Sequence, residues 1–106
     1  IYGDGNQTRD YIYVADVVSA LIKSSEIDND LFLNIGTGVE TSVNELVSLI
    51  ATKTSWVGEP DYKPQRDGEL LRSVLNNNKA KKSLDWEPEY DLKKGIEELV
   101  DWFKNS

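Results

Sequence analysis

Residues 3–17 read GDGNQTRDYIYVADV, a stretch in which a glycine-containing turn and one arginine precede alternating tyrosines and aliphatic residues. Glycine lets the backbone turn tightly or approach a ligand closely, and the guanidinium of Arg9 is a planar set of donors suited to phosphate oxygens. A strand over residues 9–14 would carry tyrosines on one face and aliphatic side chains on the other. The stretch is therefore either an ordinary amphipathic strand with an exposed arginine or one wall of a ligand site.

The same stretch resembles the signature G-D-G-x-Q-x-R-D-Y-I-Y-V-x-D-V of nucleotide-sugar epimerases and dehydratases. These are extended short-chain dehydrogenases/reductases, and the resemblance is strongest to the UDP-glucose 4-epimerases among them. Four later segments resemble elements of the family and follow in its order: LNIGTG at 33–38, TSVNEL at 41–46, RDGE at 66–69 and KAKKSLDWEP at 79–88. Each match is weak alone, but the ordered set spans nearly all 106 residues and is specific.

The resemblance implies an α/β chain, with residues 1–106 as the C-terminal, substrate-binding portion of an extended Rossmann-type epimerase. In that family an N-terminal Rossmann domain holds NAD on a glycine-rich loop and moves the proton with a tyrosine–lysine pair. Neither feature is found here. The expected partners are a nucleotide sugar (a UDP-sugar above all), the protein's own N-terminal domain and a second copy in a homodimer. Passage of a hydride from the sugar to NAD and back would allow inversion of the sugar carbon.

The resemblance also assigns substrate contacts to five residues. Arg9 and Arg66 are expected to hold the diphosphate. Tyr11 and Glu69 are expected to meet the ribose of the nucleoside, with Gln7 close by. Many relatives carry aspartate where Glu69 stands, so the longer side chain keeps an acceptor but changes its reach. From the residues alone, two guanidinium groups match the roughly two negative charges of a diphosphate, and the alternative is two surface charges on an acidic chain.

No catalytic set is visible in the sequence. Histidine and cysteine are absent, which removes the usual bases, nucleophiles and zinc ligands. We therefore expect no catalytic, cofactor-binding or metal-ligating residue in this chain. Gly36-Thr37-Gly38 lacks the third glycine of a dinucleotide fingerprint and is interpreted as a turn after a strand. Two other functions remain open: a dehydratase, decarboxylase or reductase of the same family, and a stand-alone binding module without catalysis.

Composition narrows the possible partners and locations. A formal net charge of −7 argues against a general nucleic-acid binder, which needs a basic face. The absence of cysteine is consistent with a reducing cytoplasm. No apolar run approaches the roughly 20 residues that span a bilayer, so no membrane contact is expected. The chain has no methionine and opens inside a motif, so we expect it to be part of a longer protein.

Hydrophobic spacing predicts a mixed chain of three or four helices and short strands. The helices are expected from a cap at Asp16 to about residue 24–26, from a capping box of Ser42 and Glu45, over 78–84, and from Asp91 onward. Their apolar stripes are Val14, Val17, Val18, Leu21 and Ile22; Val43, Leu46, Val47 and Ile50; and, last, Leu92, Ile96, Leu99, Val100 and Phe103. A strand or an extended segment is expected at 9–14, and strands are expected at 31–35 and 73–75. Trp86 and Trp102 are expected in the core, with Trp56 left open.

Overall fold

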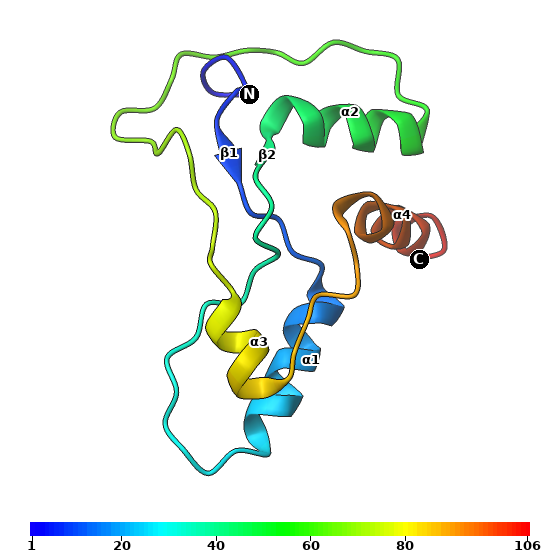
Figure 1. The fold of residues 1–106 in the computed structure, drawn as a ribbon. Coiled ribbons are helices and arrows are strands. Elements are labelled where there is room, and N and C mark those ends of the chain that lie inside the picture. Colours follow the sequence, from blue (N-terminus) through cyan, green and yellow to red (C-terminus); the bar gives the residue numbers. More distant parts are fainter.

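The computed structural model describes residues 1–106 and has four helices and one two-stranded sheet (Figure 1). In chain order the elements are β1 Thr8–Arg9, α1 Val14–Ser25, β2 Thr41–Ser42, α2 Val43–Thr54, α3 Asn78–Leu84 and α4 Leu92–Lys104. Residues 55–77 form a long connection without a helix or a strand of the sheet. The α/β class predicted from the sequence is confirmed. None of the four helices is both long enough and apolar enough to cross a membrane.

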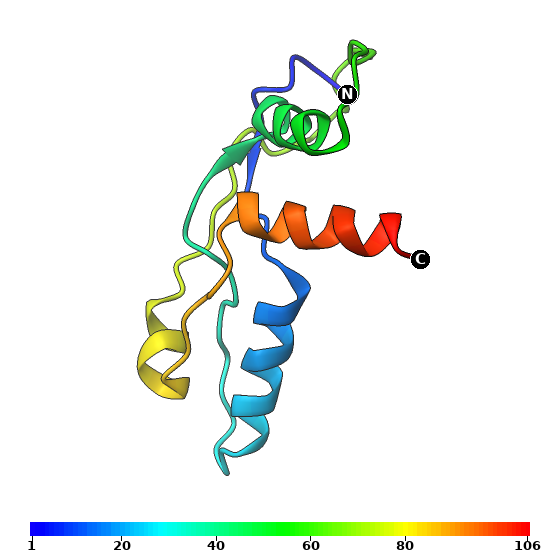
Figure 2. The same cartoon turned by 90° about the vertical axis from the view of Figure 1, so that its right-hand side faces the viewer.

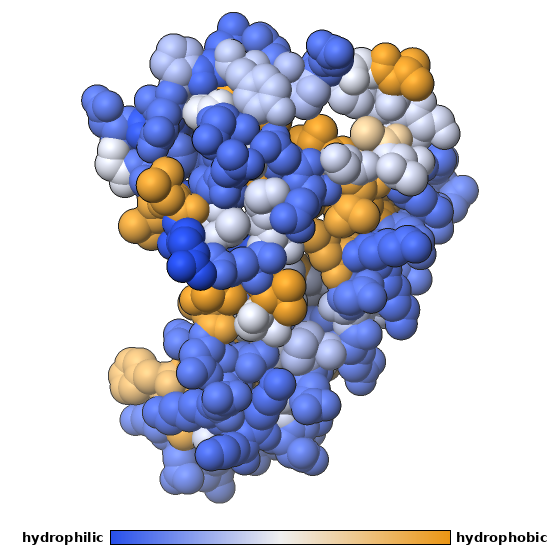
Figure 3. All heavy atoms as spheres, turned by 45° about the horizontal axis from the view of Figure 1, so that its top comes forward, coloured by the Kyte–Doolittle hydropathy of each residue, from blue (hydrophilic) through white to orange (hydrophobic).

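The helices are spread along an open, flat molecule. Helix α2 lies at one end, α1 and α3 lie at the other, and α4 lies across the space between them (Figures 1 and 2). The radius of gyration is 16.1 Å, whereas a compact domain of this length has about 13 Å. The accessible surface is 7714 Å², against about 6,000 Å² for a folded monomer of this mass. Hydrophobic residues consequently remain on the surface, where Figure 3 shows them in orange across the middle of the molecule.

One core lies between α1, α3 and the segment that follows α3. Its buried members are Ala20, Ala80, Leu84 and Trp86. The indole of Trp86 is 1% exposed, and its Nε1 donates hydrogen bonds to the backbone carbonyl of Asp16 and to Ser19 Oγ, both at 3.0 Å. The prediction that Trp86 packs in the core is confirmed.

Asp16 was predicted to cap α1, and this prediction is wrong. The helix begins at Val14 after Tyr13, which makes no side-chain capping bond. Asp16 lies in the first turn and is buried, and its carboxylate accepts hydrogen bonds from the backbone N–H groups of Glu89 and Tyr90 at 2.8 and 3.1 Å. The carboxylate therefore joins α1 to the segment before α4, two parts of the chain that are more than 70 residues apart.

The predicted apolar stripe of α1 faces largely away from this core. Val14, Leu21 and Ile22 are each more than half exposed, and Val18 is 46% exposed. The face that carries Asp16 and Ala20 packs inward instead. Helix α1 is apolar on two sides, and the chain supplies a neighbour for only one of them.

A second core lies between α2 and α4. Ile96 and Val100 of α4 are buried, and Gly95 packs against Tyr13. The predicted N-caps are confirmed: Ser42 Oγ accepts from Glu45 N–H, and the Asp91 carboxylate accepts from Lys94 N–H. Of the predicted capping box, only this bond to Ser42 is formed. The α2 stripe is only half-buried, apart from the exposed Ile50.

The outer side of α4 differs from the prediction. Leu99 of the stripe is 46% exposed and Phe103 is 65% exposed. Trp102 was predicted in the core, but it is 63% exposed and stacks edge-on against Phe103. The C-terminal turns of α4 are therefore not covered by any other part of this chain.

Two of the predicted strands are absent, since residues 31–35 and 73–75 form none. In the segment 9–14, which was predicted as a strand or an extended segment, Arg9 belongs to β1, residues 10–13 lie outside any helix or strand, and Val14 begins α1. No backbone hydrogen bond joins 31–35 to another segment, and Phe32 within it is 89% exposed. A strand requires a partner strand for its N–H and C=O groups, and no backbone segment of this chain pairs with 31–35 or 73–75.

Candidate functional site

The candidate site is built around β1, which places Arg9. Strand β1 pairs antiparallel with β2, with Thr8 opposite Ser42 and Arg9 opposite Thr41. On its other edge, the N–H of Thr8 donates to the carbonyl of Leu71 at 2.9 Å. Residues near 71 therefore lie beside β1 although they follow it by more than 60 positions. This neighbour brings Glu69 within 3.6 Å of the Arg9 guanidinium.

A second part of the candidate site is built around Tyr2. The guanidinium of Arg66 lies over the Tyr2 ring, 4.0 Å from its centroid. Gln7 is buried, and its Nε2 donates to the Tyr2 carbonyl at 2.9 Å. Gln7 and Glu69 line one small cavity together with Tyr2, Gly3, Asp4, Gln65 and Leu71. Four of the five predicted site residues thus gather at one end of the molecule.

Tyr11, the fifth predicted residue, lies in different surroundings. It is half-buried and lines an apolar cavity of about 290 Å³ between α2 and α4, with Leu46, Ile50 and Leu99 among the other lining residues. Its neighbour Tyr13 also lines this cavity and stacks on Tyr90, with ring centroids 4.6 Å apart. The structure does not bring Tyr11 into contact with the residues around Tyr2.

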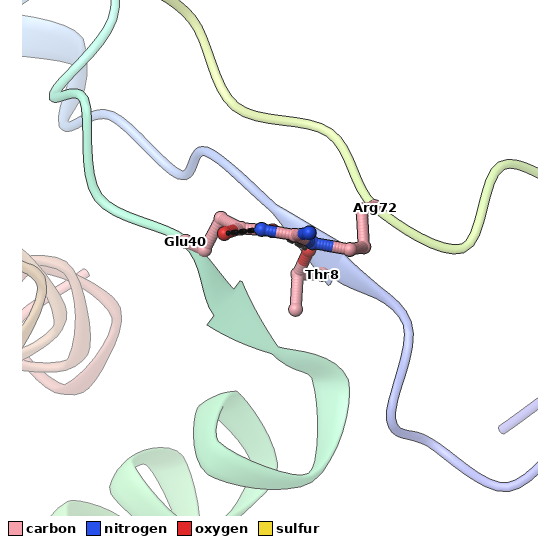
Figure 4. Close-up of polar contacts among 3 residues, drawn as sticks. All are labelled: Thr8, Glu40 and Arg72. Carbon is pink, nitrogen blue, oxygen red and sulfur yellow. Dashed lines mark hydrogen bonds and ion pairs between the residues drawn. The ribbon is translucent and has the colours of Figure 1, made fainter.

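An ion pair that the sequence did not reveal lies across β1 (Figure 4). The Glu40 carboxylate accepts from Arg72 Nε at 2.9 Å and from Arg72 Nη2 at 2.7 Å. It also accepts from Thr8 Oγ1 at 2.8 Å. The bonds from Arg72 and Thr8 lower the pKa of Glu40 to about 2, and the carboxylate in turn raises the pKa of Arg72. No spacing rule predicts a pair separated by 32 residues.

Asp10 is a further side chain whose contacts the sequence did not reveal. Its carboxylate accepts from Thr37 N–H and Oγ1, from Gly38 N–H and from Leu75 N–H, at 2.6 to 3.3 Å. Burial acts to raise the pKa of Asp10, but these hydrogen bonds outweigh it and the pKa is lowered. Asp10 thereby anchors the turn at 36–38 beside the residue that follows β1.

The side chains around Arg9 and Tyr2 are suited to binding a ligand. Arg9 Nη1 donates to the Thr8 carbonyl and Nη2 lies 3.6 Å from Glu69, so its fork is only partly engaged. Arg66 is exposed and makes no ion pair. Two guanidinium groups with free donors and one nearby carboxylate acceptor suit an anion that also carries hydroxyls. No cluster of acidic residues is arranged to hold a metal ion.

Comparison with known proteins gives one family. The family model described as GDP-mannose 4,6 dehydratase matches residues 1–99. UDP-glucose 4-epimerase of Mycolicibacterium smegmatis is 42% identical over 106 residues, which cover 99% of this chain and 34% of that protein.

Solved structures agree with this. A UDP-glucose 4-epimerase of Thermotoga maritima, solved with UDP-glucose, superimposes with a TM-score of 0.94 at 43% identity, over 99% of this chain and 34% of that one. The UDP-glucose 4-epimerase of Bifidobacterium longum, solved with NAD+ and UDP, gives a TM-score of 0.90 at 27% identity, over 100% and 34%. The chain thus spans about a third of the length of the relatives it matches.

Proposed function

The chain belongs to the GDP-mannose 4,6 dehydratase family, and from this premise we propose that it is the C-terminal, substrate-binding portion of an NAD-dependent nucleotide-sugar epimerase. The family match confirms the resemblance to nucleotide-sugar epimerases and dehydratases seen in the sequence. UDP-sugars are the proposed substrates, since the two solved relatives above hold UDP-glucose and UDP.

The observation that carries this proposal is that Arg9 and Arg66 both lie beside residues of one small cavity. Arg9 is 3.6 Å from Glu69, which lines that cavity. Arg66 lies over the ring of Tyr2, which also lines it. Arg9 comes from β1, and Arg66 comes from a loop 57 positions later that lies between two tethers to the N-terminal segment, at Lys63 and at Leu71. Both guanidinium groups are accessible and keep free donors. Two such groups match the charge of a sugar diphosphate and can bind it in the bidentate manner of arginine. Glu69 and Gln7 beside them are the proposed contacts for the nucleoside.

The role proposed for Tyr11 is separate, because Tyr11 does not lie with the other four residues. Its exposed part lies in the cavity between α2 and α4 rather than beside Arg9. We propose that it contacts the nucleoside ribose only when the remainder of the protein completes the site.

NAD is proposed to bind outside this chain. The turn at 36–38 is the glycine-containing loop closest in pattern to a dinucleotide loop, but the N–H groups of Thr37 and Gly38 already donate to the Asp10 carboxylate. A pyrophosphate needs such N–H groups free, and the carboxylate would repel it. The residues present therefore do not fit NAD, and we assign it to the remainder of the protein.

The same remainder is the proposed partner of the exposed apolar surface. The accessible area exceeds that of a compact monomer by about 1,700 Å², which is about twice the area of roughly 800 Å² that one partner contributes to an ordinary stable interface. Exposed apolar side chains on the outer face of α1 and backbone without hydrogen bonds at 31–35 are two of the places where this chain lacks a neighbour. A Rossmann domain would offer a sheet edge and a packing face to both. A homodimer of the whole enzyme and a cytoplasmic location remain expectations.

The proposal is tested by calorimetric titration of UDP and of NAD into the intact protein. Arg9→Ala and Arg66→Ala should each weaken UDP binding about tenfold or more, because each removes a charge-assisted bond of roughly 1.5–3 kcal/mol. NAD affinity should not change. Lys53→Ala, which removes a positive charge from the far α2–α4 pair, is the matched control. If both arginine variants bind UDP as tightly as the wild type, the site assignment is wrong.

Dehydration, decarboxylation or reduction of a nucleotide sugar is the alternative activity, and the description of the family model favours the first of these. The acid and base groups that separate these reactions from epimerisation are not among the residues at this site. Product analysis of UDP-glucose incubated with the intact protein and NAD distinguishes them. UDP-galactose indicates epimerisation, and a 4-keto-6-deoxy sugar indicates dehydration. No turnover of any nucleotide sugar would favour a binding module without catalysis.

A further inference from the structure

The Glu40–Arg72 pair joins three segments that lie side by side. Strand β2 follows Glu40, β1 contains Thr8, and Arg72 follows Leu71 on the far edge of β1. Figure 4 shows the Arg72 side chain reaching across β1 to Glu40, with the Thr8 hydroxyl between them. The Glu40–Arg72 pair therefore connects the two segments that lie on either side of β1.

This geometry differs from that of an ordinary surface ion pair. Exposed pairs contribute little to stability unless they are bidentate or part of a network. Here the carboxylate accepts two parallel bonds from one guanidinium and a third from Thr8. By contrast, the exposed Lys63–Asp61 pair has a single contact at 3.0 Å between near neighbours in the sequence.

The stretch from Arg66 to Glu69 has few other restraints. Before it, Lys63 is tied to the N-terminal segment through the N–H of Gly3 and the carbonyl of Ile1. Within it, the only backbone bond runs from Glu69 N–H to the Arg66 carbonyl at 3.4 Å. After it, the restraints are the Thr8–Leu71 backbone bond and the Arg72 side chain. Besides the contacts of its own side chains with Tyr2 and Arg9, this stretch is thus held only by the restraints that flank it, and those at Leu71 and Arg72 are the ones that join it to β1.

We propose that Glu40 and Arg72 are positioning residues that hold the 66–69 stretch against Arg9, so that Arg9 and Arg66 can engage one diphosphate together. The inference rests on the proposed function, because it presumes that those two arginines bind the substrate. Arg72 is one of only three arginines in the chain, but its Nε and Nη2 donors are both committed to Glu40. The edge of its guanidinium that could bind a phosphate through two parallel bonds is thus occupied by Glu40, and we assign Arg72 a role that acts through the other two arginines.

The experiment uses the intact protein with Glu40→Gln, Arg72→Gln, the double variant and Arg72→Lys. UDP and NAD affinities are measured by calorimetry, and amide hydrogen exchange at Thr8 is measured without ligand. Each single variant should bind UDP about five- to tenfold more weakly, with the double variant no weaker than either, as for two residues of one network. Arg72→Lys should recover part of the affinity, because it restores the charge without the fork. NAD affinity should be unchanged, and Thr8 should exchange faster in the Gln variants.

Asp101→Asn is the matched control for Glu40→Gln, since it removes one carboxylate from the Lys53–Asp101 pair away from the site. It should leave UDP affinity unchanged. The inference is overturned if the Glu40 and Arg72 variants bind UDP within twofold of the wild type while Arg9→Ala loses affinity. It is also overturned if UDP and NAD affinity fall together, which would mean general destabilisation. If Arg9→Ala itself has no effect, the proposed function fails and the inference fails with it.

Discussion

Trp86 donates a hydrogen bond from its Nε1 to the backbone carbonyl of Asp16, 3.0 Å away and 70 residues earlier in the chain. Both residues are almost fully buried. The Asp16 carboxylate then accepts from two further N–H groups just beyond Trp86. The two side chains together fasten α1 to the segment that leads into α4, so they are the natural place to test the packing.

Replacing Trp86 should be costly. Trp86→Ala removes a large buried ring and leaves a cavity, so it should destabilise the protein by about 3–5 kcal/mol. Trp56→Ala, at a half-exposed position in the long connection, should change stability by no more than about 1 kcal/mol. Urea unfolding of the intact protein followed by circular dichroism measures both. Equal effects of the two substitutions would contradict the role of Trp86 as a core residue.

Replacing Asp16 tests the polar half of the same junction. Asp16→Ala leaves the N–H groups of Glu89 and Tyr90 without their protein partners. The change should cost about 1–3 kcal/mol in total, because these groups are only partly buried and water can replace part of what is lost. Asp16→Asn keeps one acceptor oxygen and should cost less. Asp28→Ala, at an exposed position, is the control and should be near neutral in the same unfolding measurement. A neutral Asp16→Ala would show that these bonds contribute nothing to stability.

Two glycines with positive φ form a matched pair. Gly5 has φ +79° and Gly68 has φ +75°. A Cβ on Gly5 would collide with the Asn44 side chain, whereas one on Gly68 would have no heavy atom within 4 Å. Gly68→Ala should cost about 1–2 kcal/mol from backbone strain alone, and Gly5→Ala should cost about 1–3 kcal/mol more from overpacking. Thermal melting of both variants tests the order, which would be refuted by equal shifts.

Stability should fall in acid. The pKa of Glu40 is lowered from 4.5 to about 2, and that of Asp10 is also lowered. Between about pH 2 and pH 4.5 the folded state therefore binds fewer protons than the unfolded state. The stabilisation from these carboxylates is present above about pH 4.5 and is lost as the pH falls toward 2. The melting temperature measured from pH 6 to pH 2.5 should drop, with a smaller drop in Glu40→Gln. An unchanged slope in that variant would contradict the ion pair with Arg72.

Arg66→Lys should separate charge from geometry in the site. An ammonium keeps the positive charge but cannot offer two parallel donors to a phosphate. UDP affinity should therefore lie between that of the wild type and that of Arg66→Ala in calorimetric titration. Full recovery would mean that charge alone is recognised, and the bidentate contact would then be excluded.

Local signals predicted the helices well. Helix α3 covers residues 78–84 as expected, and α4 begins after Asp91 with the predicted capping bond. Both depend on interactions within a few positions, which the sequence displays directly. The strand at 31–35 and the burial of Trp102 were predicted wrongly because each requires a neighbour that this chain does not contain. Hydrophobicity indicates that a residue will be covered, but it does not indicate by what.

The site was predictable only in part, for a similar reason. Arg9 and Glu69 were identified through a family resemblance, and the structure places them 3.6 Å apart. Asp10, Glu40 and Arg72 were missed because their partners lie 27 to 65 positions away. Side-chain pairs at such separations follow no period, so only the folded arrangement reveals them.

The long separation between Asp16 and its partners also sets an order of events during synthesis. The carboxylate cannot find the N–H groups of Glu89 and Tyr90 until more than 70 further residues have been made, which takes several seconds or more on a ribosome at about 5–20 residues per second. Throughout that time the Asp16 carboxylate lacks the two N–H partners that it has in the folded protein. The junction between α1 and the segment before α4 therefore forms only after that segment has been made.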